Sequence, residues 1–185
     1  NAFGQKYFRD FPSEDTPGVA NQSGEAANVV VRQSIYELGG EQSVASVTGE
    51  TVTVDANSTK DVTLTTKVDS PKLWDTDNPN LYTAVTEVLV DDQVVDTYTT
   101  EFGFRWTEFN NTTGFELNGV PTRLKGVCMH HDQGALGSEA WYRAIERQVE
   151  ILKEMGCNAI RVTHNPAAPE LVEIANRKGI MLIDE

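Results

Sequence analysis

Three apolar runs decide the fold: LKGVCM at residues 124–129, AIRV at 159–162 and IMLI at 180–183. The stretch between the first two runs predicts a helix from an N-cap at Ser138 to Met155. The stretch between the last two predicts a helix that starts at Pro169 and ends at Lys178-Gly179. Strands that alternate with helices through short links predict three parallel strands joined by right-handed crossovers.

Each predicted helix carries one apolar stripe. Residues three or four positions apart lie on the same face of a helix. This spacing occurs at Ile145, Val149 and Leu152 in the first helix, and at Leu171, Ile174 and Ala175 in the second. We therefore expect both helices to pack against the sheet through these stripes.

The chain upstream of Trp106 follows a different pattern. It is rich in Val, Thr and Tyr, and clusters of Gly, Asp, Asn and Ser divide it into short segments. Strands are expected at Ala27–Tyr36, Glu50–Asp55, Lys60–Val68, Leu81–Val90 and Val94–Phe102. Several short strands without an intervening helix predict a β-sandwich of the immunoglobulin-like kind over residues 27–106. Residues 1–26 are expected to be irregular, and residues 107–185 to form a separate α/β domain.

Two dipeptides predict tight β-hairpins. Asn118-Gly119 lies between the predicted short strands Gly114–Leu117 and Val120–Leu124, and Asn-Gly suits a turn that needs positive φ at both central residues. Asp91-Asp92 lies between two Val-rich segments and is expected to form a similar turn.

Composition excludes several classes of partner. The 185 residues contain 15 Lys and Arg against 28 Asp and Glu, which gives a net charge of −13. Such a chain is poorly suited to nucleic acid or to an anionic membrane surface, and no apolar run approaches the roughly 20 residues that span a bilayer. We therefore expect no nucleic-acid and no membrane partner. Cys128 and Cys157 lie in apolar segments and are expected to be buried thiols, and the compartment stays open.

Polar side chains follow each of the three predicted parallel strands. They are His130 and His131 after the first, His164 and Asn165 after the second, and Asp184 and Glu185 after the third. The carboxyl ends of parallel strands meet at one edge of a sheet, where such folds bind ligands. Because neutral imidazoles both donate to and accept from hydroxyl groups, this edge suits a polyol.

Arg161 is a charged residue inside an otherwise apolar strand, so it needs a partner. Either Asp184 or Glu185 is one candidate, and a carboxylate from elsewhere is the other. A transition-metal site that uses Cys128, His130, His131, Asp132 and His164 is a weaker alternative, since their spacing matches no tetrahedral zinc pattern.

From Pro71 onward the chain resembles family 2 of the glycoside hydrolases, the group of β-galactosidases and β-glucuronidases. The matching stretches are Pro71–Trp74, Asn78–Tyr82, Phe102–Arg105, Gly114–Gly119, Leu124–Val127 with His130, Leu136-Gly137, Asn158–Pro166 and Ile183–Glu185. The sequence HHDQG at 130–134 is most similar to the β-galactosidase branch.

The resemblance implies an immunoglobulin-like β-sandwich that leads into a partial (β/α)8 TIM barrel with three parallel strands and two helices. It implies that His130, His164 and Asn165 bind the sugar, and that Arg161 orients the nucleophilic glutamate. It implies that the chain is part of a retaining enzyme that hydrolyses terminal β-galactosides. The alternatives are a carbohydrate-binding module and a purely structural β-sandwich.

The two catalytic carboxyl groups are not expected in these residues. A retaining glycosidase needs two of them about 5 Å apart, and the resemblance implies that they follow the fourth and seventh barrel strands. We therefore expect the chain by itself to be inactive and to hold no catalytic glutamate, no metal and no cofactor. Ligands for a divalent metal such as Mg²⁺, where the family has one, are expected beyond Glu185. The open edge of a three-stranded sheet is expected to cause self-association.

Overall fold

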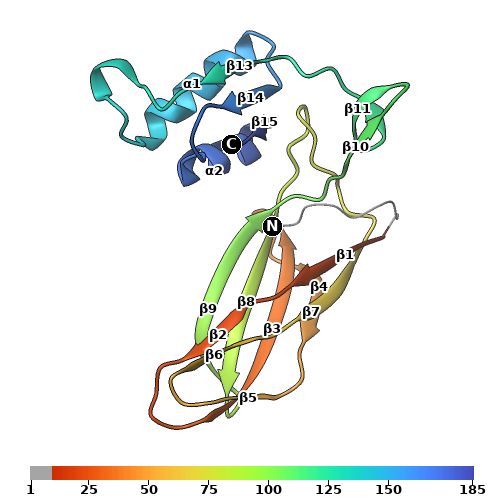
Figure 1. Ribbon diagram of the computed structural model, residues 1–185. Coiled ribbons are helices and arrows are strands. Elements are labelled where there is room, and N and C mark those ends of the chain that lie inside the picture. The colour runs from red at the N-terminus through yellow and green to blue at the C-terminus, as the bar shows by residue number, and fades with distance from the viewer. Residues whose placement is uncertain (1–9) are drawn as a thin grey trace. The chain divides into compact units, whose positions relative to one another are not determined.

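The computed structural model describes residues 10–185, which form two compact units (Figure 1). The first, here called the sandwich unit, comprises residues 10–71 and 82–102. The second, here called the parallel unit, comprises residues 72–81 and 103–185. The sequence places residues 72–81 inside the sandwich, but in the structure this segment packs with the parallel unit.

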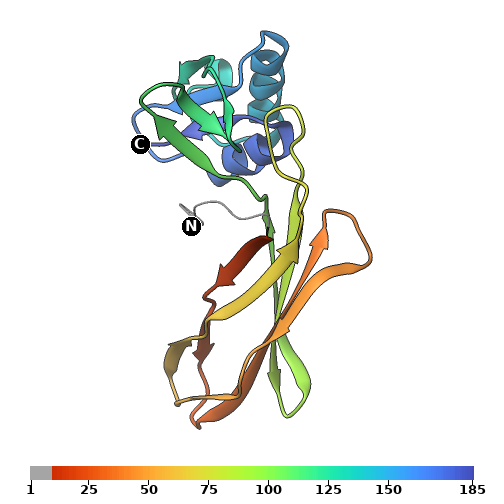
Figure 2. The same cartoon turned by 90° about the vertical axis from the view of Figure 1, so that its right-hand side faces the viewer.

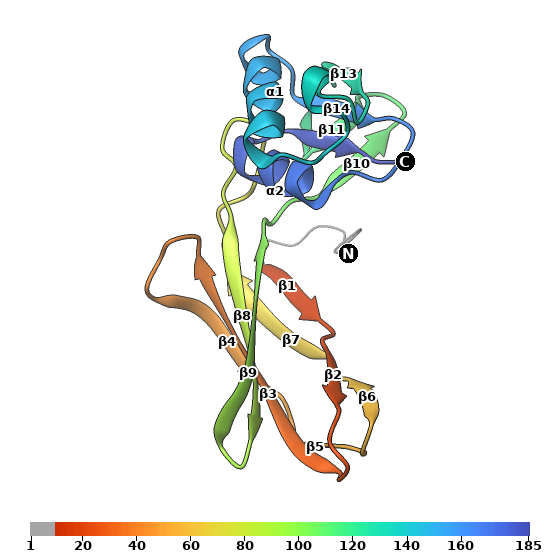
Figure 3. The same ribbon diagram turned by 90° about the vertical axis from the view of Figure 1, so that its left-hand side faces the viewer.

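The sandwich unit has two layers of antiparallel strands (Figure 3). One layer contains, in spatial order, β4 (Ser43–Thr48), β3 (Ala27–Glu37), β8 (Tyr82–Val90) and β9 (Gln93–Phe102), and β5 (Val52–Val54) also pairs with β3. The other layer contains the pairs β1 (Asp10–Asp15) with β7 (Leu64–Asp69), and β2 (Gly18–Asn21) with β6 (Ser58–Asp61).

Alternation along β3 builds the core between these layers. Val29, Val31 and Ile35 point inward and are at most 4% exposed, as expected for a strand with one buried face. Gln33 lies on the same buried face, where its Nε2 donates to the Thr86 hydroxyl at 3.0 Å. A buried amide therefore keeps a hydrogen-bond partner inside an apolar layer.

The prediction that residues 1–26 are irregular is wrong for β1 and β2, while residues 1–9 lie outside the described residues. Each of these strands is stabilised by pairing with a segment about 40 or more positions further along the chain, which no local pattern reveals. β4 was also not predicted, and the single strand expected at Lys60–Val68 is divided between β6 and β7. The strands expected at Ala27–Tyr36, Leu81–Val90 and Val94–Phe102 are confirmed within one residue.

Both predicted hairpin turns are confirmed by their backbone angles. Asp91 and Asp92 have φ of 48° and 61°, and Asn118 and Gly119 have φ of 54° and 77°. Positive φ at both central residues is the property of a type I′ turn, whose twist matches that of paired strands.

The parallel unit contains the three predicted parallel strands and two helices (Figure 2). The strands are β13 (Gly126–Met129), β14 (Ala159–Val162) and β15 (Met181–Ile183), and the helices are α1 (Tyr142–Glu154) and α2 (Pro169–Lys178). A short antiparallel sheet precedes them, made of β10 (Thr107–Asn110), β11 (Gly114–Leu117) and β12 (Val120–Pro121). No helix within residues 10–185 is long and apolar enough to cross a membrane.

The predicted start of the first helix is wrong. A 3₁₀ turn, η1 (Gly134–Leu136), occupies part of the preceding loop, and α1 begins only after Trp141. Ser138 therefore lies in the loop and does not cap the helix. α2 agrees with its prediction, from Pro169 at its first position to Gly179, whose φ of 71° ends the helix in the left-handed region.

The apolar stripes of both helices pack on β14, as predicted. Ile145 and Val149 of α1 and Ile174 of α2 form one buried cluster with Ile160 and Val162. All five side chains are at most 3% exposed. Burial of this cluster stabilises the unit by roughly 1.5–3 kcal/mol per large aliphatic side chain.

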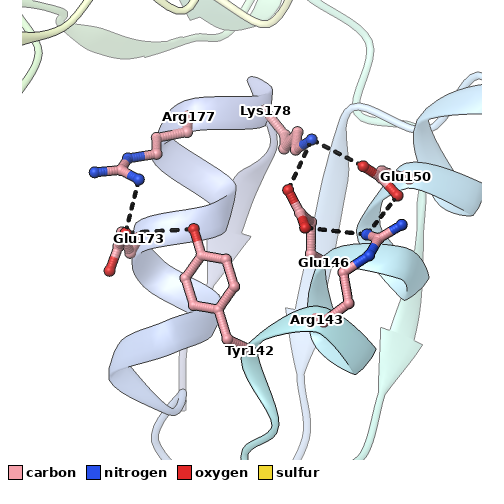
Figure 4. Close-up of polar contacts among 7 residues, drawn as sticks. All are labelled: Tyr142, Arg143, Glu146, Glu150, Glu173, Arg177 and Lys178. Carbon is pink, nitrogen blue, oxygen red and sulfur yellow. Dashed lines mark hydrogen bonds and ion pairs between the residues drawn. The ribbon is translucent and has the colours of Figure 1, made fainter. Parts of the chain in front are cut away.

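A network of ion pairs joins the outer faces of the two helices (Figure 4). Lys178 of α2 lies 3.0 Å from Glu146 and 2.9 Å from Glu150 of α1, and Arg143 lies 3.0 Å and 2.8 Å from the same two carboxylates. The hydrogen bonds from Arg143 and then Lys178 lower the pKa of Glu150. Glu146 and Glu150 are therefore bound by cations of both helices, and they form no acid/base pair.

Trp74 attaches the segment 72–81 to the rest of the parallel unit. Its side chain is 2% exposed, and its indole Nε1 donates to the Asn176 carbonyl of α2 at 2.7 Å. The Arg105 guanidinium lies 4.4 Å from the centre of the ring, a cation–π geometry. Nearby, Lys153 Nζ donates to the Thr76 carbonyl at 2.6 Å, so α1 holds the same segment.

A substitution at Gly126 tests whether β13 and β14 must approach each other closely. A Cβ at this position lies only 2.0 Å from the Ala159 carbonyl oxygen, which is backbone and cannot move aside. We expect Gly126→Ala to lower the free energy of unfolding of the parallel unit by at least about 1–3 kcal/mol. Tryptophan fluorescence during denaturant unfolding measures this selectively, because all three tryptophans, at 74, 106 and 141, lie in the parallel unit.

Gly24→Ala is the matched control, because nothing lies within 4 Å of a Cβ at Gly24. Equal unfolding midpoints for Gly126→Ala and the unaltered chain would contradict the close approach of these strands.

Candidate functional site

The register of the parallel sheet brings the predicted polar residues to one edge. Met129 is paired with Val162, and Arg161 is paired with both Cys128 and Ile183. His130, His164 and Asp184 come directly after these paired positions or within two residues of them. The carboxyl ends of all three strands therefore carry the candidate site, as expected for a ligand-binding edge.

Glu185 is the centre of a cluster of charged and imidazole groups. One of its carboxylate oxygens, Oε1, pairs with Nη2 of Arg161, and the other, Oε2, lies 3.0 Å from Nδ1 of His164. The imidazole of His130 contacts that of His164 edge to face, with ring centres 5.7 Å apart. These four residues, Arg161, His164, His130 and Glu185, are here called the edge cluster.

The partner of Arg161 is therefore Glu185. The other candidate, Asp184, has a different role, because its Oδ1 accepts a hydrogen bond from the backbone N–H of Ala167 at 2.8 Å. This bond fixes the end of the loop into α2, three residues after His164. Asp184 thus holds the backbone before α2, whereas Glu185 holds the side chains of Arg161 and His164.

Hydrogen bonds set the charge state of the edge cluster. The bond to His164, and then the pairing with Arg161, lower the pKa of Glu185 below its ordinary value. The contact with Cys128 and the pairing with Glu185 raise the pKa of Arg161. Glu185 is therefore a stable anion and is poorly suited to act as a general acid, which needs a raised pKa.

The edge cluster faces solvent. The side chain of Arg161 is 44% exposed and that of His164 is 71% exposed, and Asn165 beside them is also exposed. Neutral imidazole nitrogens accept and donate hydrogen bonds to hydroxyl groups, and the fixed guanidinium provides a positive charge for a carboxylate. The arrangement can therefore bind a hydroxylated ligand beside an additional acidic group.

Neither cysteine is buried as predicted, and strand alternation explains the exposure of Cys128. Cys128 is exposed and Cys157 is half-buried. Met129 of β13 packs against the helices, so its neighbour Cys128 faces the opposite side of the sheet, where its Sγ lies 3.8 Å from Nη1 of Arg161. Sequence analysis missed this contact, although the pairing of parallel strands places the two residues opposite each other.

The residues of the alternative metal site are not arranged as a metal site. Within residues 10–185, no group of three or more His, Cys, Asp or Glu side chains is placed to hold a metal ion. Nε2 of His131, one of that set, is buried. The contacts of the edge cluster are an ion pair, a hydrogen bond and a ring contact.

Comparison with known proteins identifies relatives of both units. Residues 16–105 match the family model described as glycosyl hydrolases family 2, and residues 109–185 match that described as glycosyl hydrolases family 2, TIM barrel domain. A β-galactosidase of Bacteroides ovatus is 43% identical over 169 residues, which are 90% of this chain and 19% of that protein. The chain thus spans about a fifth of the length of this curated relative.

Solved structures of relatives have the same fold. A glycosyl hydrolase family 2 member from Bacteroides cellulosilyticus DSM 14838 aligns with a TM-score of 0.89 at 36% identity, over 95% of this chain and 24% of that one. A β-glucuronidase of Bacteroides uniformis aligns with a TM-score of 0.85 at 28% identity, over 94% of this chain and 21% of that one. Together with the family models, these matches confirm the predicted immunoglobulin-like sandwich and partial TIM barrel.

The pKa of Glu185 tests the geometry of the edge cluster. Because hydrogen bonding to His164 is the largest cause of its lowered pKa, we expect His164→Ala to raise that pKa toward the ordinary value of 4.5. Arg161→Met should raise it less. A carbon-13 NMR titration of the glutamate carboxyl groups measures both changes. It runs from about pH 2 to 7, a range that spans the ordinary pKa values of carboxyl groups.

Glu150 provides an internal control in the same spectra. Its pKa is lowered by Arg143 and Lys178, so it should not move in either variant. A Glu185 titration that is unaffected by His164→Ala would show that the two side chains do not interact. Since the folded pKa of Glu185 is lowered, its contribution to stability is present above about pH 4.5 and is lost as the pH falls below it.

Proposed function

Since the chain belongs to family 2 of the glycosyl hydrolases, we propose that it is part of a retaining enzyme that hydrolyses terminal β-galactosides. The single observation that supports this best is the edge cluster, in which two imidazoles and an oriented guanidinium lie at the carboxyl edge of three parallel strands. Such an enzyme forms and then hydrolyses a covalent glycosyl intermediate.

Each residue of the site has a proposed role. His130, His164 and Asn165 bind hydroxyl groups of the sugar. Arg161 orients the nucleophilic glutamate, a role that suits a guanidinium with several fixed N–H donors. Glu185 is a positioning residue, because its two oxygens hold Arg161 and His164 in place.

The two catalytic carboxyl groups are proposed to come from polypeptide outside residues 10–185. Retaining hydrolysis needs an acid/base and a nucleophile about 5 Å apart. Asp184 and Glu185, the acidic residues that follow β15, are each held by other contacts. We therefore propose that the 185 residues by themselves are inactive, and that any divalent metal the whole enzyme binds is held outside them.

A β-galactoside is favoured over a β-glucuronide by the extent of the match with relatives. The B. ovatus β-galactosidase is 43% identical over 90% of this chain, whereas a putative β-glucuronidase of Formosa agariphila is 43% identical over 64% of it.

The proposed roles predict how substitutions affect hydrolysis. In the intact enzyme that carries this chain, His164→Ala and Arg161→Ala should each lower kcat/KM for p-nitrophenyl β-galactoside by about 100- to 1,000-fold, the cost of losing one oriented donor at a reacting centre. Arg123→Ala is the matched control, since Arg123 is exposed and lies before β13, away from the edge cluster.

The 185-residue chain, assayed alone, should give no turnover above background. Turnover by this chain would contradict the proposed source of the carboxyl groups. Full activity of both variants of the intact enzyme would contradict the proposed site. Galactose binding that survives His130→Ala and His164→Ala would favour a carbohydrate-binding module, and no response to any sugar in calorimetry would favour a structural one.

We also propose that the isolated chain self-associates through the edges of its parallel sheet. Among the described residues, β13 and β15 each pair on one side only, with β14, and Ile183 of β15 is 46% exposed. Unpaired, apolar strand edges promote pairing with another chain.

Size-exclusion chromatography with light scattering should show a mass that rises with concentration. Ile183→Lys should shift the chain toward the monomer, because a charge on an edge strand opposes pairing. Val95→Lys is the matched control, since Val95 is 60% exposed on the edge strand β9 of the sandwich unit. A monomer at every concentration would contradict the proposal.

A further inference from the structure

The guanidinium of Arg161 is held by a different group at each of its two terminal nitrogens. Nη2 pairs with Oε1 of Glu185, which follows β15. Nη1 donates to Sγ of Cys128 at 3.8 Å, and Cys128 belongs to β13 on the other side of β14. The guanidinium is therefore held from both strands that flank its own.

The contact between Cys128 and Arg161 follows from the register of the sheet. The two residues are paired across β13 and β14. Their neighbours Met129, Ile160 and Val162 pack with the helices, so Cys128 and Arg161 both point to the opposite face. A substitution at position 128 therefore changes what the guanidinium contacts and leaves the core packing in place.

The two contacts fix the plane of the guanidinium and leave donors over. An arginine side chain has five N–H donors in one plane. Acceptors on opposite sides hold both terminal nitrogens of Arg161 and restrict rotation of this plane. The remaining N–H groups lie in the same plane, where they can donate to a further acceptor such as the carboxylate of the proposed nucleophile.

The kind of acceptor at Nη1 determines the charge that an incoming carboxylate meets. Glu185 already supplies one negative charge, and its second oxygen is shared with His164. A thiol is an uncharged, weak acceptor near pH 7, so Cys128 holds Nη1 without neutralising Arg161 any further. A carboxylate in its place would compete for the guanidinium and repel another anion.

We infer that Cys128 is a positioning residue, whose thiol holds the Arg161 guanidinium from β13 and keeps its positive charge available to the nucleophilic carboxylate. The inference rests on the proposed function, because that carboxylate is proposed to come from polypeptide outside residues 10–185. The effect of Cys128 on Arg161 and Glu185 does not depend on hydrolysis, so the chain alone can test it.

A pair of variants separates charge from shape. Cys128→Asn and Cys128→Asp introduce side chains of the same shape that differ in charge, and Cys128 is exposed. In the 185-residue chain, Cys128→Asp should raise the pKa of Glu185, because a second carboxylate competes for Arg161 and repels Glu185. Cys128→Asn should leave that pKa unchanged. A carbon-13 NMR titration of the glutamate carboxyl groups measures both, with Glu150 of α1 as the internal control.

Kinetics of the intact enzyme that carries this chain test the link to the nucleophile. The acidic limb of the pH profile of kcat/KM reports the pKa of the group that must be ionised in the free enzyme, here the nucleophile. Relative to Cys128→Asn, Cys128→Asp should move this limb upward by about one pH unit and lower kcat/KM about 10-fold on its acidic side. A merely structural role would change the height of the profile and leave the limb in place.

Cys157 provides the matched control. It precedes β14 at the opposite end of the strand from the edge cluster, so Cys157→Asn and Cys157→Asp should share one pH profile. Tryptophan fluorescence checks the fold of each variant. If Cys128→Asp fails to fold, Cys128→Val and Cys128→Ser decide: the first lacks an acceptor and should have a kcat/KM about fivefold below that of the second.

The inference and the proposed function fail in different ways. If the intact enzyme hydrolyses the galactoside, but Cys128→Asn and Cys128→Asp agree either in the pKa of Glu185 or in the pH profile, the inference is overturned and the proposed function stands. If Cys128→Asp raises the pKa of Glu185 but the unaltered enzyme hydrolyses no β-galactoside, the proposed function and the link to the nucleophile fail together, and only the contact with Arg161 remains.

Discussion

The pairing of Arg161 with Glu185 organises the candidate site. This guanidinium belongs to β14 between two completely buried residues, Ile160 and Val162, but its side chain is 44% exposed on the opposite face of the sheet. Glu185 provides the partner and uses its second oxygen to hold His164. One acidic residue therefore links the end of β15 to β14 and fixes the position of an imidazole that faces solvent.

Because side chains alternate along β14, the residues that build the core and the residue that belongs to the candidate site lie on opposite faces of the sheet. Ile160 and Val162 pack under α1 and α2, while Arg161 faces the other side of the sheet with Cys128. Successive residues of a strand point to opposite faces, so the packing that builds the core also determines which side chains reach the site. The ion pairs between Lys178 and Glu146 and Glu150 are on the outer faces of the helices and do not compete with it.

Sequence analysis could predict the parallel unit because its signals are local. Helical spacing, Pro169 and Gly179 defined α2 to the residue, and the apolar run at 159–162 is β14. The strands β1 and β2 were missed because they depend on partners far along the chain, at Leu64–Asp69 and Ser58–Asp61. Local composition there, rich in Asp, Ser and Pro, is typical of loops.

The site was predicted in outline and left open in detail. Residues that follow parallel strands gather at one edge whatever the exact register, so the proximity of His130 and His164 could be expected. The choice of Glu185 over Asp184 as the partner of Arg161 depends on which way each side chain points after β15 ends, and spacing alone does not determine that.

A crystal structure of the intact enzyme with a non-hydrolysable thio-β-galactoside tests the central claim most directly. The account predicts galactose hydroxyl groups within hydrogen-bond distance of His130 and His164, with the Arg161 and Glu185 side chains still paired beside them. A galactose ring bound away from this edge of the sheet, with both imidazoles untouched, would contradict it.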